Sequence, residues 1–212
     1  VFIKIKWLGH SSFLLEDSMG HKLLTDPFDE TVGYKVFRGK VDLITISHSH
    51  FDHNYTKNIE YSHIINKPGS FNLCGIPIIG IPSYHDKVNG AKRGKNIIFI
   101  IEMDGYRICH LGDIGYVLSR DKVEELGSID VLFIPVGGNF TIDGKEAAAL
   151  AKSINSHIVI PMHYKTSPLT FELDGLEKFL KYARNAERVK NNTLIIENNL
   201  QEYNSVKILD FK

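Results

Sequence analysis

Residues 41–53 have the sequence Val-Asp-Leu-Ile-Thr-Ile-Ser-His-Ser-His-Phe-Asp-His, in which an apolar run passes directly into a cluster of histidines. Residues 43–46 have the composition of a strand that is buried on both faces. Polar side chains directly after such a strand lie at the usual position of a binding or catalytic site. Chance alone would place H-x-H-x-D-H in about one of a thousand chains of this composition. We therefore take residues 48–53 as the centre of the functional site.

The spacing within this motif suggests two neighbouring ion sites. His48 and His50 are two residues apart, so in an extended chain they point the same way and can hold one ion. Asp52 and His53 follow where we expect the chain to turn toward a helix, and they can face a second ion. Imidazole and carboxylate ligands together suit Zn²⁺, Mn²⁺ or Fe²⁺, whereas a structural zinc cluster would normally use thiolates.

Composition limits the remaining classes of protein. The chain has 212 residues, 43% of them hydrophobic, and a formal net charge of zero. We expect one domain over residues 1–212, because no linker-like segment divides the sequence. Zero net charge argues against binding to nucleic acid or to a membrane by bulk electrostatics. Cys74 and Cys109 form no C-x-x-C pair, and residues 1–6 alternate like a strand without a signal-peptide pattern, so we expect a cytoplasmic protein.

Hydrophobic periodicity predicts many strands and a few helices. We expect strands at 2–8, 12–16, 22–25, 41–47, 76–81, 96–103, 106–111, 131–134, 158–161, 194–197 and 206–209. Helices are expected at 120–126, 145–154 and 176–186, the last two capped by Asp143 and Asp174. Strands followed by strand–helix alternation predict two sheets packed face to face with helices outside, an α/β layered sandwich.

Together these features resemble the metallo-β-lactamase superfamily, whose fold is a four-layer αβ/βα sandwich. The resemblance extends to its small L-ascorbate-6-phosphate-lactonase-like branch and covers residues 2–164 in the family's order. The matching segments are WLGHSSFLLE at 7–16, LTDPF at 24–28, LGD at 111–113 and IPMHY at 160–164. From about residue 198 onward we find no segment that aligns, so that stretch stays unassigned.

The resemblance implies a dinuclear metal centre with Zn²⁺ or Mn²⁺, and Fe²⁺ as a further option. The first ion would be held by His48, His50 and a third histidine. The second would be held by Asp52, His53 and His163, with Asp113 bridging the two ions.

His85 and His110 compete for the place of the third histidine. His85 follows an apolar run and precedes a glycine-rich loop, which matches the family's position for this ligand. His110 lies only three residues before Asp113, and positions three apart in a strand face opposite sides. Both could ligate only if the chain bends at Gly112. We favour His85 and interpret His110 as a supporting or proton-transfer group.

Two of the implied ligands are also plausible from the residues alone. His163 ends the apolar run 157–162, as His48 ends its own. Asp113 follows the apolar run 108–112, where a carboxylate is costly unless it meets a cation. We expect Asp26 to orient the 48–53 loop through hydrogen bonds, and we leave His10 open between a role in the site and a structural role.

These ligands predict hydrolysis, with Asp52, Asp113 and His110 as the catalytic residues. Two adjacent ions lower the pKa of a shared water and polarise the substrate, so no serine or cysteine nucleophile is required. We expect a small-molecule hydrolase. A nuclease resembling tRNA 3′-end processing enzymes is the second hypothesis, disfavoured because the chain has neither a long insertion nor a basic charge. A non-catalytic binding module is the third.

The sequence indicates the substrate less specifically than it indicates the metal ligands. Loop 86–95 carries four basic residues against one acid, which favours an anionic ester, lactone or phosphodiester near the metal. Lys92, Arg93 and Lys95 are the candidate contacts, and a merely solvated loop is the alternative. Asn139, in the segment 136–141, is a candidate for the wall of the pocket unless that segment is only a turn. The oligomeric state stays open, a homo-oligomer included.

Overall fold

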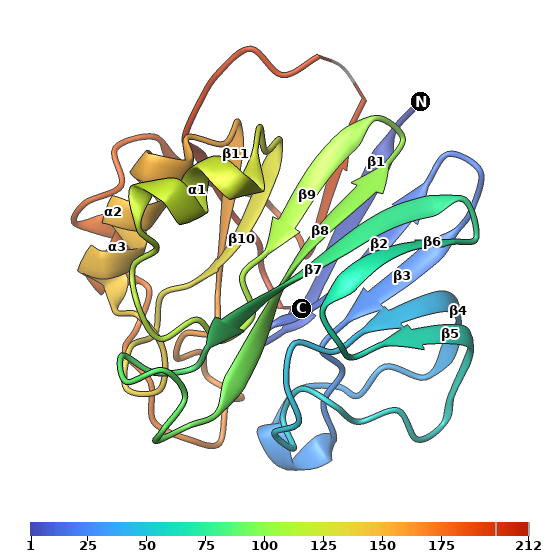
Figure 1. Cartoon of the computed structure of the whole chain (residues 1–212), viewed down its shortest axis with the longest axis horizontal. Coiled ribbons are helices and arrows are strands. Elements are labelled where there is room, and N and C mark those ends of the chain that lie inside the picture. The colour runs from blue at the N-terminus through green and yellow to red at the C-terminus, as the bar shows by residue number, and fades with distance from the viewer. Residues whose placement is uncertain (198, 212) are drawn as a thin grey trace.

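A computed structural model of the chain describes residues 1–197 and 199–211 and contains two mixed β-sheets (Figure 1). The smaller sheet has the order β13-β1-β2-β3-β4-β5 and consists of β1 (Ile3–Gly9), β2 (Ser12–Asp17), β3 (Lys22–Thr25), β4 (Gly39–Thr45), β5 (Ile59–Ile65) and β13 (Thr193–Ile196). The larger has the order β12-β14-β11-β10-β9-β8-β7-β6 and consists of β6 (Gly69–Leu73), β7 (Ile76–Tyr84), β8 (Lys95–Met103), β9 (Tyr106–His110), β10 (Val131–Pro135), β11 (Ile158–Met162), β12 (Ala186–Arg188) and β14 (Ser205–Ile208).

The inner faces of the two sheets share one hydrophobic core. Trp7 and Phe13 of the six-stranded sheet and Phe99 and Phe133 of the eight-stranded sheet are almost fully buried in it. Phe13 stacks on Phe133 with ring centroids 3.9 Å apart, which joins β2 to β10. The predicted α/β layered sandwich is therefore confirmed. The assignment of residues 1–212 to one domain stays a proposal, which this shared core supports.

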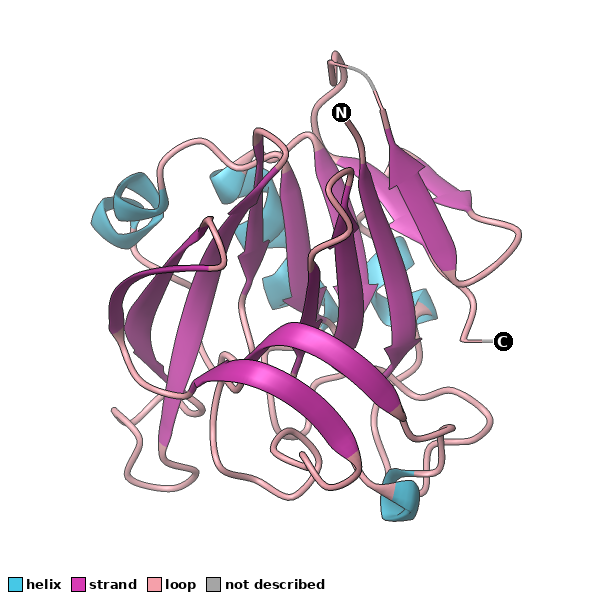
Figure 2. Cartoon of the chain, turned by 90° about the vertical axis from the view of Figure 1, so that its right-hand side faces the viewer, coloured by secondary structure: helices cyan, strands magenta, loops and turns pink. Residues whose placement is uncertain are grey.

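The two sheets differ in what covers their outer faces. Every residue of β10 and β11 is buried, as expected for strands covered on both sides. In β1, buried residues alternate with half-buried ones, because only one face of that strand meets the core. The three α-helices of the described residues lie beside β10 and β11, and they appear behind or beside the strands when the molecule is turned (Figures 1 and 2).

The helices begin and end largely where the sequence predicts. α1 is Arg120–Leu126 and α2 is Gly144–Ile154, and Asp143 caps α2 in a capping box with Glu146. The prediction for 176–186 is wrong in length, because α3 covers only Glu177–Leu180. Asp174 is not its cap. The carboxylate of Asp174 instead accepts a hydrogen bond from Lys178 Nζ at 2.6 Å.

Three strands were not expected from the sequence. Strand β5 is buried only at its two ends, and β12 is exposed throughout, so neither shows the alternation that identifies a strand. β6 is likewise largely exposed. The expected turn toward a helix after Asp52 is also wrong. Residues 50–53 form a turn in which His53 N donates to His50 O at 3.0 Å, and the chain then enters β5.

The stretch without family resemblance completes the larger sheet. β14 pairs in parallel with β11 and with β12. Residues 198 and 212 of this stretch lie outside the described residues.

Within the described residues, no helix has the length and apolar character needed to cross a membrane.

Candidate metal centre

The histidine and aspartate residues of the site follow the ends of four different strands. Residues 48–53 follow β4, His85 follows β7, Asp113 follows β9 and His163 follows β11. β9, β10 and β11 are mutually parallel, so their carboxyl ends meet at one edge of the larger sheet. The sequence therefore brings together ligands that are more than a hundred residues apart. We call His48, His50, Asp52, His53, His85, Asp113 and His163 the His–Asp cluster.

Asp113 lies at the middle of this cluster. Its Oδ2 is 3.1 Å from Nε2 of His53, 3.1 Å from Nε2 of His85 and 3.0 Å from Nε2 of His163. Nε2 of His48 lies 3.7 Å from the same oxygen. One carboxylate oxygen thus faces imidazoles from both groups of the expected ligands, which is the arrangement that a bridging ligand requires.

The remaining ligand atoms fall into two groups, and a third group of Asp26, His48 and His53 connects the two. In the first, the ring nitrogens of His48, His50 and His85 lie within 4.8 Å of one another. The second group has the same compactness and consists of His10, Asp52, His53 and His163. The structure thus places the expected ligands of each ion side by side, with His10 as an additional member.

The cluster has donor atoms that suit a bound transition metal. His48 Nε2 and Asp113 Oδ1 are buried and have no hydrogen-bond partner among the described residues. Leaving such atoms unpaired is costly, so they point to a group that they would bind. Nitrogen and carboxylate oxygen donors without sulfur fit Zn²⁺, Mn²⁺ or Fe²⁺.

His85 and His110 occupy very different surroundings. His85 faces Asp113, whereas both ring nitrogens of His110 are held by the backbone. Nε2 of His110 donates to Ser11 O at 2.8 Å, and its Nδ1 accepts from Gly112 N at 3.1 Å. The ring lies between the sheets, with centroids 5.9 Å from that of Phe133. Both ring nitrogens of His110 are thus engaged by the backbone. A catalytic role for His110 stays a prediction, and these contacts favour the supporting role over proton transfer.

Gly112 makes the turn that separates these two side chains. Its φ of +57° lies in the left-handed region, and a Cβ there would come within 2.3 Å of Asn96 Oδ1. The bend lets the chain leave β9 so that His110 faces the core and Asp113 faces the cluster. Asn96 Oδ1 also accepts from Asp113 N at 3.0 Å, which fixes the backbone after the bend.

Asp26 orients the 48–53 loop, as expected. Its Oδ1 accepts from Ser47 N at 2.7 Å, and its Oδ2 accepts from Ser47 Oγ at 2.5 Å and from His53 Nδ1 at 2.9 Å. Burial alone would raise the pKa of Asp26, but the hydrogen bond and charge of His53 hold it below its ordinary value. The carboxylate therefore stays ionised and points Nε2 of His53 toward Asp113.

His10, which the sequence left open, belongs to the site. Its Nε2 lies 2.8 Å from Asp52 Oδ2, its ring is 4.2 Å from that of His163, and its carbonyl accepts from His163 N at 3.1 Å. Burial, and then the charge of His163, lower the pKa of His10 to about 4. His10 is thus neutral near pH 7 and donates Nε2–H to Asp52.

Charge is distributed unevenly within the cluster. Burial, and then the charge of His53, lower the pKa of His48 to about 3, so its ring is neutral and offers a lone pair. Burial would also lower the pKa of His53, but Asp113 and Asp52 raise it well above its ordinary value. Burial alone would raise the pKa of Asp113, but the charges of His163 and His53 hold it well below the usual range.

Three residues of the site have left-handed backbone conformations. The φ angles are 52° for His10, 39° for Asp26 and 52° for His163. Such conformations are uncommon outside glycine, and they concentrate at functional sites. They let the chain turn sharply as it leaves a strand, which directs these side chains toward the cluster.

A cavity of about 540 Å³ opens onto the cluster. It is lined by Ser49, His50, Phe51, Asp52, His85, Arg93, Asp113, Phe140, His163 and Phe171. Of the substrate contacts expected from the sequence, Arg93 is in this lining. Lys92 and Asn139 line a neighbouring depression, and Asn139 Nδ2 donates to Glu172 O at 3.0 Å. Lys95 is exposed at the start of β8.

Sequence reasoning missed the three phenylalanines of this cavity. Phe51 lies inside the histidine motif and is 57% exposed, so an apolar residue among ligands was a usable signal. Phe140 lies in the segment that we expected to form a wall, although we named Asn139 instead. Phe171 lies in a loop without any recognisable motif.

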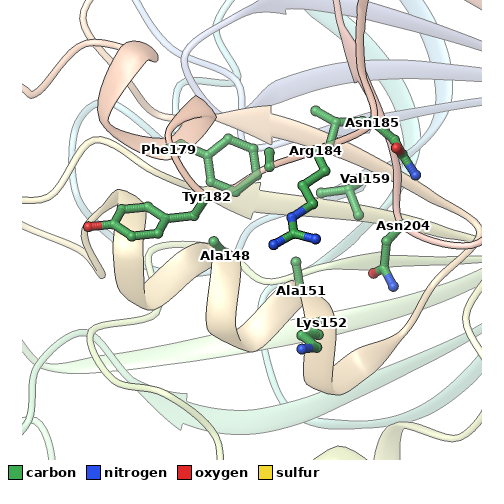
Figure 3. A pocket seen from close by; sticks show the side chains of 11 residues that line it. Ala148, Ala151, Lys152, Val159, Phe179, Tyr182, Arg184, Asn185 and Asn204 are labelled. Atoms are coloured by element: carbon green, nitrogen blue, oxygen red, sulfur yellow. The ribbon is translucent and has the colours of Figure 1, made fainter.

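A second cavity, of about 440 Å³, lies away from the cluster, between α2 and residues 179–185 (Figure 3). The side chains of Lys152 and Arg184 extend over a floor that includes Ala148, Ala151 and Phe179. Neither histidine nor carboxylate occurs among the described residues that line it. Of these two cavities, only the first is therefore lined by described residues that could bind a metal.

Comparison with known proteins places these features in context. The model of the Beta-lactamase superfamily domain matches residues 4–163. UPF0173 metal-dependent hydrolases of Thermococcus kodakarensis and Pyrococcus abyssi are 31% and 32% identical to the chain, each covering 78% of it and 86% of the relative. A candidate Zn-dependent hydrolase of the metallo-beta-lactamase superfamily from Thermotoga maritima has a similar structure, with a TM-score of 0.82, 39% identity and 98% of both chains covered. Igni18, a metallo hydrolase from Ignicoccus hospitalis, shares the fold with a TM-score of 0.68 at 22% identity, over 94% of this chain and 100% of that one.

Proposed function

Because the chain belongs to the beta-lactamase superfamily and is a metal-dependent hydrolase, we propose that it cleaves a small ester, lactone or phosphodiester at a dinuclear centre. The central observation is the position of Asp113 Oδ2, which lies 3.0–3.1 Å from imidazole nitrogens of His53, His85 and His163. A mononuclear site would not need a carboxylate shared between two groups of ligands.

The proposed ligand sets follow the two groups of side chains. His48, His50 and His85 would hold the first ion, and Asp52, His53 and His163 would hold the second, with Asp113 between them. When bound, such a pair of ions supplies an activated water and polarises the substrate oxygen. Zn²⁺ and Mn²⁺ are the proposed ions, with Fe²⁺ as the third option, because the donors are imidazole and carboxylate.

The protein groups around the cluster have separate tasks. Asp52 lines the cavity. Burial alone would raise the pKa of Asp52, but the charge of His53 and the hydrogen bond from His10 hold it well below its ordinary value. Its carboxylate is therefore ionised and can accept a hydrogen bond from the attacking water. His10 fixes that carboxylate, and Asp26 fixes His53, so the geometry is set before substrate arrives.

The proposed setting is a reducing one, and a small molecule is the proposed substrate. Cys74 and Cys109 are both free thiols, which supports a cytoplasmic location. The cavity of about 540 Å³ has the volume of a typical small-molecule site.

Elemental analysis combined with an activity assay tests the proposal. We expect two transition-metal ions per chain after reconstitution, and metal-dependent hydrolysis of bis-p-nitrophenyl phosphate or of a simple ester. One ion per chain at saturation would contradict the dinuclear centre. Fully metal-loaded protein that cleaves tRNA with a steep salt dependence, but no small substrate, would instead favour the nuclease.

A further inference from the structure

Apart from Ser49, the cavity over the His–Asp cluster is lined by two groups of side chains. The first group, which we call the metal-side wall, consists of His50, Asp52, His85, Asp113 and His163. The second group, which we call the aromatic wall, consists of Phe51, Arg93, Phe140 and Phe171. The proposed function accounts for the metal-side wall only.

Two phenyl rings of the aromatic wall form a chain of ring contacts that reaches His10. Phe140 and Phe171 meet at 6.3 Å with a nearly perpendicular geometry, and Phe171 meets the ring of His10 edge-on at 5.3 Å. His10 in turn bonds to Asp52. Phe51 lies between two candidate metal ligands in the sequence and is 57% exposed. Phe140 and Phe171 are half-buried and also pack against the cluster around Phe28. One exposed and two half-buried apolar rings that line a cavity beside a reactive centre indicate an apolar ligand group.

Arg93 adds one positive charge to this apolar surface. Its Cζ lies 4.5 Å from the centroid of the Phe140 ring, and no described carboxylate forms an ion pair with it. Its backbone N–H donates to Asp86 Oδ2 at 2.7 Å, which anchors the residue in the loop. Among the described residues that line the cavity, Arg93 is the one Lys or Arg.

The other cations of the same loop serve elsewhere. Lys87 forms an ion pair with Glu146, at the start of α2. Lys92 lines the neighbouring depression, and Lys95 is exposed at the start of β8. Although the loop has a net charge of +3, only Arg93 places its positive charge at the cavity, and its guanidinium lies against the ring of Phe140.

We infer that the substrate's non-reacting part is an aromatic or similarly flat apolar group that carries one negative charge. The inference rests on the proposed function for the position of the scissile bond. A phenyl or comparable ring would lie among Phe51, Phe140 and Phe171, and its carboxylate or phosphate would pair with Arg93. A polyhydroxylated sugar phosphate fits poorly, because its hydroxyl groups would lose water against rings that offer no hydrogen bond.

Two matched series of substrates test this inference. The first consists of the acetate esters of methanol, benzyl alcohol and para-carboxybenzyl alcohol, and the second of the methyl phosphodiesters of the same alcohols. These alcohols have similar acidity, so the chemical step is comparable while the recognised group changes. We expect kcat/KM to rise about tenfold from methyl to benzyl and about tenfold again on adding the carboxylate, since each contact contributes on the order of 1.4 kcal/mol.

Variants show which residue is responsible for each of the two rises in kcat/KM. Phe171→Ala should remove most of the first rise, and Arg93→Gln should remove the second while leaving the first. Tyr203→Ala and Arg120→Gln change an exposed aromatic and an exposed arginine elsewhere in the molecule, and both should behave like the unaltered protein. Unchanged ratios in Phe171→Ala and Arg93→Gln would overturn the inference.

Binding separates this inference from the proposed function. Calorimetry with metal-loaded protein should show para-(hydroxymethyl)benzoate binding at least about tenfold more tightly than benzyl alcohol or glycerol phosphate. Equal or tighter binding of glycerol phosphate would overturn the inference. If the benzoate is preferred but no member of either series is hydrolysed, the inference is supported and the proposed hydrolysis is contradicted.

Discussion

The metal-side wall and the aromatic wall of one cavity differ in how the chain holds them. The residues of the metal-side wall lie within seven residues of the ends of β4, β7, β9 and β11, and all but His50 are buried. Arg93, Phe140 and Phe171 come from loops between elements and are only half-buried. The difference indicates that the groups for chemistry are fixed by two packed sheets, whereas the groups for recognition lie on segments that can change without disturbing the sheets.

Their electrostatics differ as well. The metal-side wall includes the buried carboxylates of Asp52 and Asp113. Burial alone would raise their pKa values, but the charges of neighbouring histidines hold both well below the ordinary range. The aromatic wall has rings and a single guanidinium. Changes to the first wall should therefore remove chemistry, and changes to the second should alter substrate choice.

The largest effect is expected from Asp113→Ala. Loss of the shared carboxylate should lower metal occupancy and reduce kcat/KM by about a thousandfold or more, the scale seen when a central electrostatic group is removed. Circular dichroism should still show folded protein, and elemental analysis should report the lost metal. An Asp113→Ala protein that retains full activity would break the dinuclear assignment.

His85→Ala and His110→Ala form a matched pair for the third histidine. His85→Ala should lose one ion per chain and most activity. His110→Ala should keep both ions but lose about 1–3 kcal/mol of unfolding free energy, because Ser11 O and Gly112 N lose their partner in the core. Urea denaturation and elemental analysis report the two quantities. Metal loss in His110→Ala alone would reverse the assignment.

Asp26→Asn tests the hydrogen bonds that orient His53 within the His–Asp cluster. The asparagine side chain is neutral and has a single accepting oxygen, so it cannot accept all three hydrogen bonds of Asp26. The ring of His53 is then held less firmly. We expect metal affinity to fall by about 10–100-fold, the usual range for a carboxylate behind a metal-binding histidine. Competition with a chelator measures the affinity. Asp17→Asn, which alters a carboxylate–histidine pair far from the cluster, is the control and should leave the affinity unchanged.

Asp86→Asn tests the loop that carries Arg93, and its effect should be the smallest. Oδ1 of Asp86 accepts from Val88 N and Gly90 N, and Oδ2 accepts from Lys92 N and Arg93 N. With a neutral amide the loop should loosen, raising KM for anionic substrates by about threefold with little change in kcat, as expected for weakened binding. An equal rise in KM for uncharged substrates would argue against a link to Arg93.

The same carboxylate predicts a pH effect. Burial would raise the pKa of Asp86, but the four backbone N–H groups, led by that of Arg93, hold it at about 2, below its ordinary value of 3.8. A lowered folded-state pKa stabilises the protein above pH 3.8, and this contribution is lost as pH falls toward 2. The stability difference between the unaltered protein and Asp86→Asn should therefore shrink between pH 5 and pH 3. Urea unfolding followed by the fluorescence of buried Trp7 measures it, and a constant difference would contradict this role.

Much of the His–Asp cluster could be predicted, because its ligands follow patterns that are recognisable in the sequence. His48 and His163 each end an apolar run, and the packing of the two sheets brings the ends of β4 and β11 together. His10 could not be assigned, because its contact with Asp52 depends on a left-handed turn and joins residues 42 positions apart in the sequence. The family resemblance supplied the choice of His85, whose contact with Asp113 no local pattern reveals.

The aromatic wall and several elements follow weaker patterns or none. We expected Lys92 and Lys95 at the substrate because the charge of their loop follows from the sequence. The sequence does not show in which directions the side chains of that loop point. Asp86 decides those directions by binding four backbone groups of the loop. Strand β5 escaped prediction because an edge strand with exposed polar residues lacks the alternation of a buried one.

The left-handed backbones of His10, Asp26 and His163 have a consequence for laboratory evolution. A non-glycine residue in that conformation costs on the order of 1–3 kcal/mol, which glycine or asparagine would relieve in part. For Asp26 the three buried hydrogen bonds that its carboxylate accepts offset this strain. A library selected for resistance to heat should therefore enrich such replacements at His10 and His163, and each replacement removes an imidazole from the site. Thermal selection without an activity screen should thus yield sturdier proteins that have lost the centre, so these two positions are the ones to hold constant in any stabilised version.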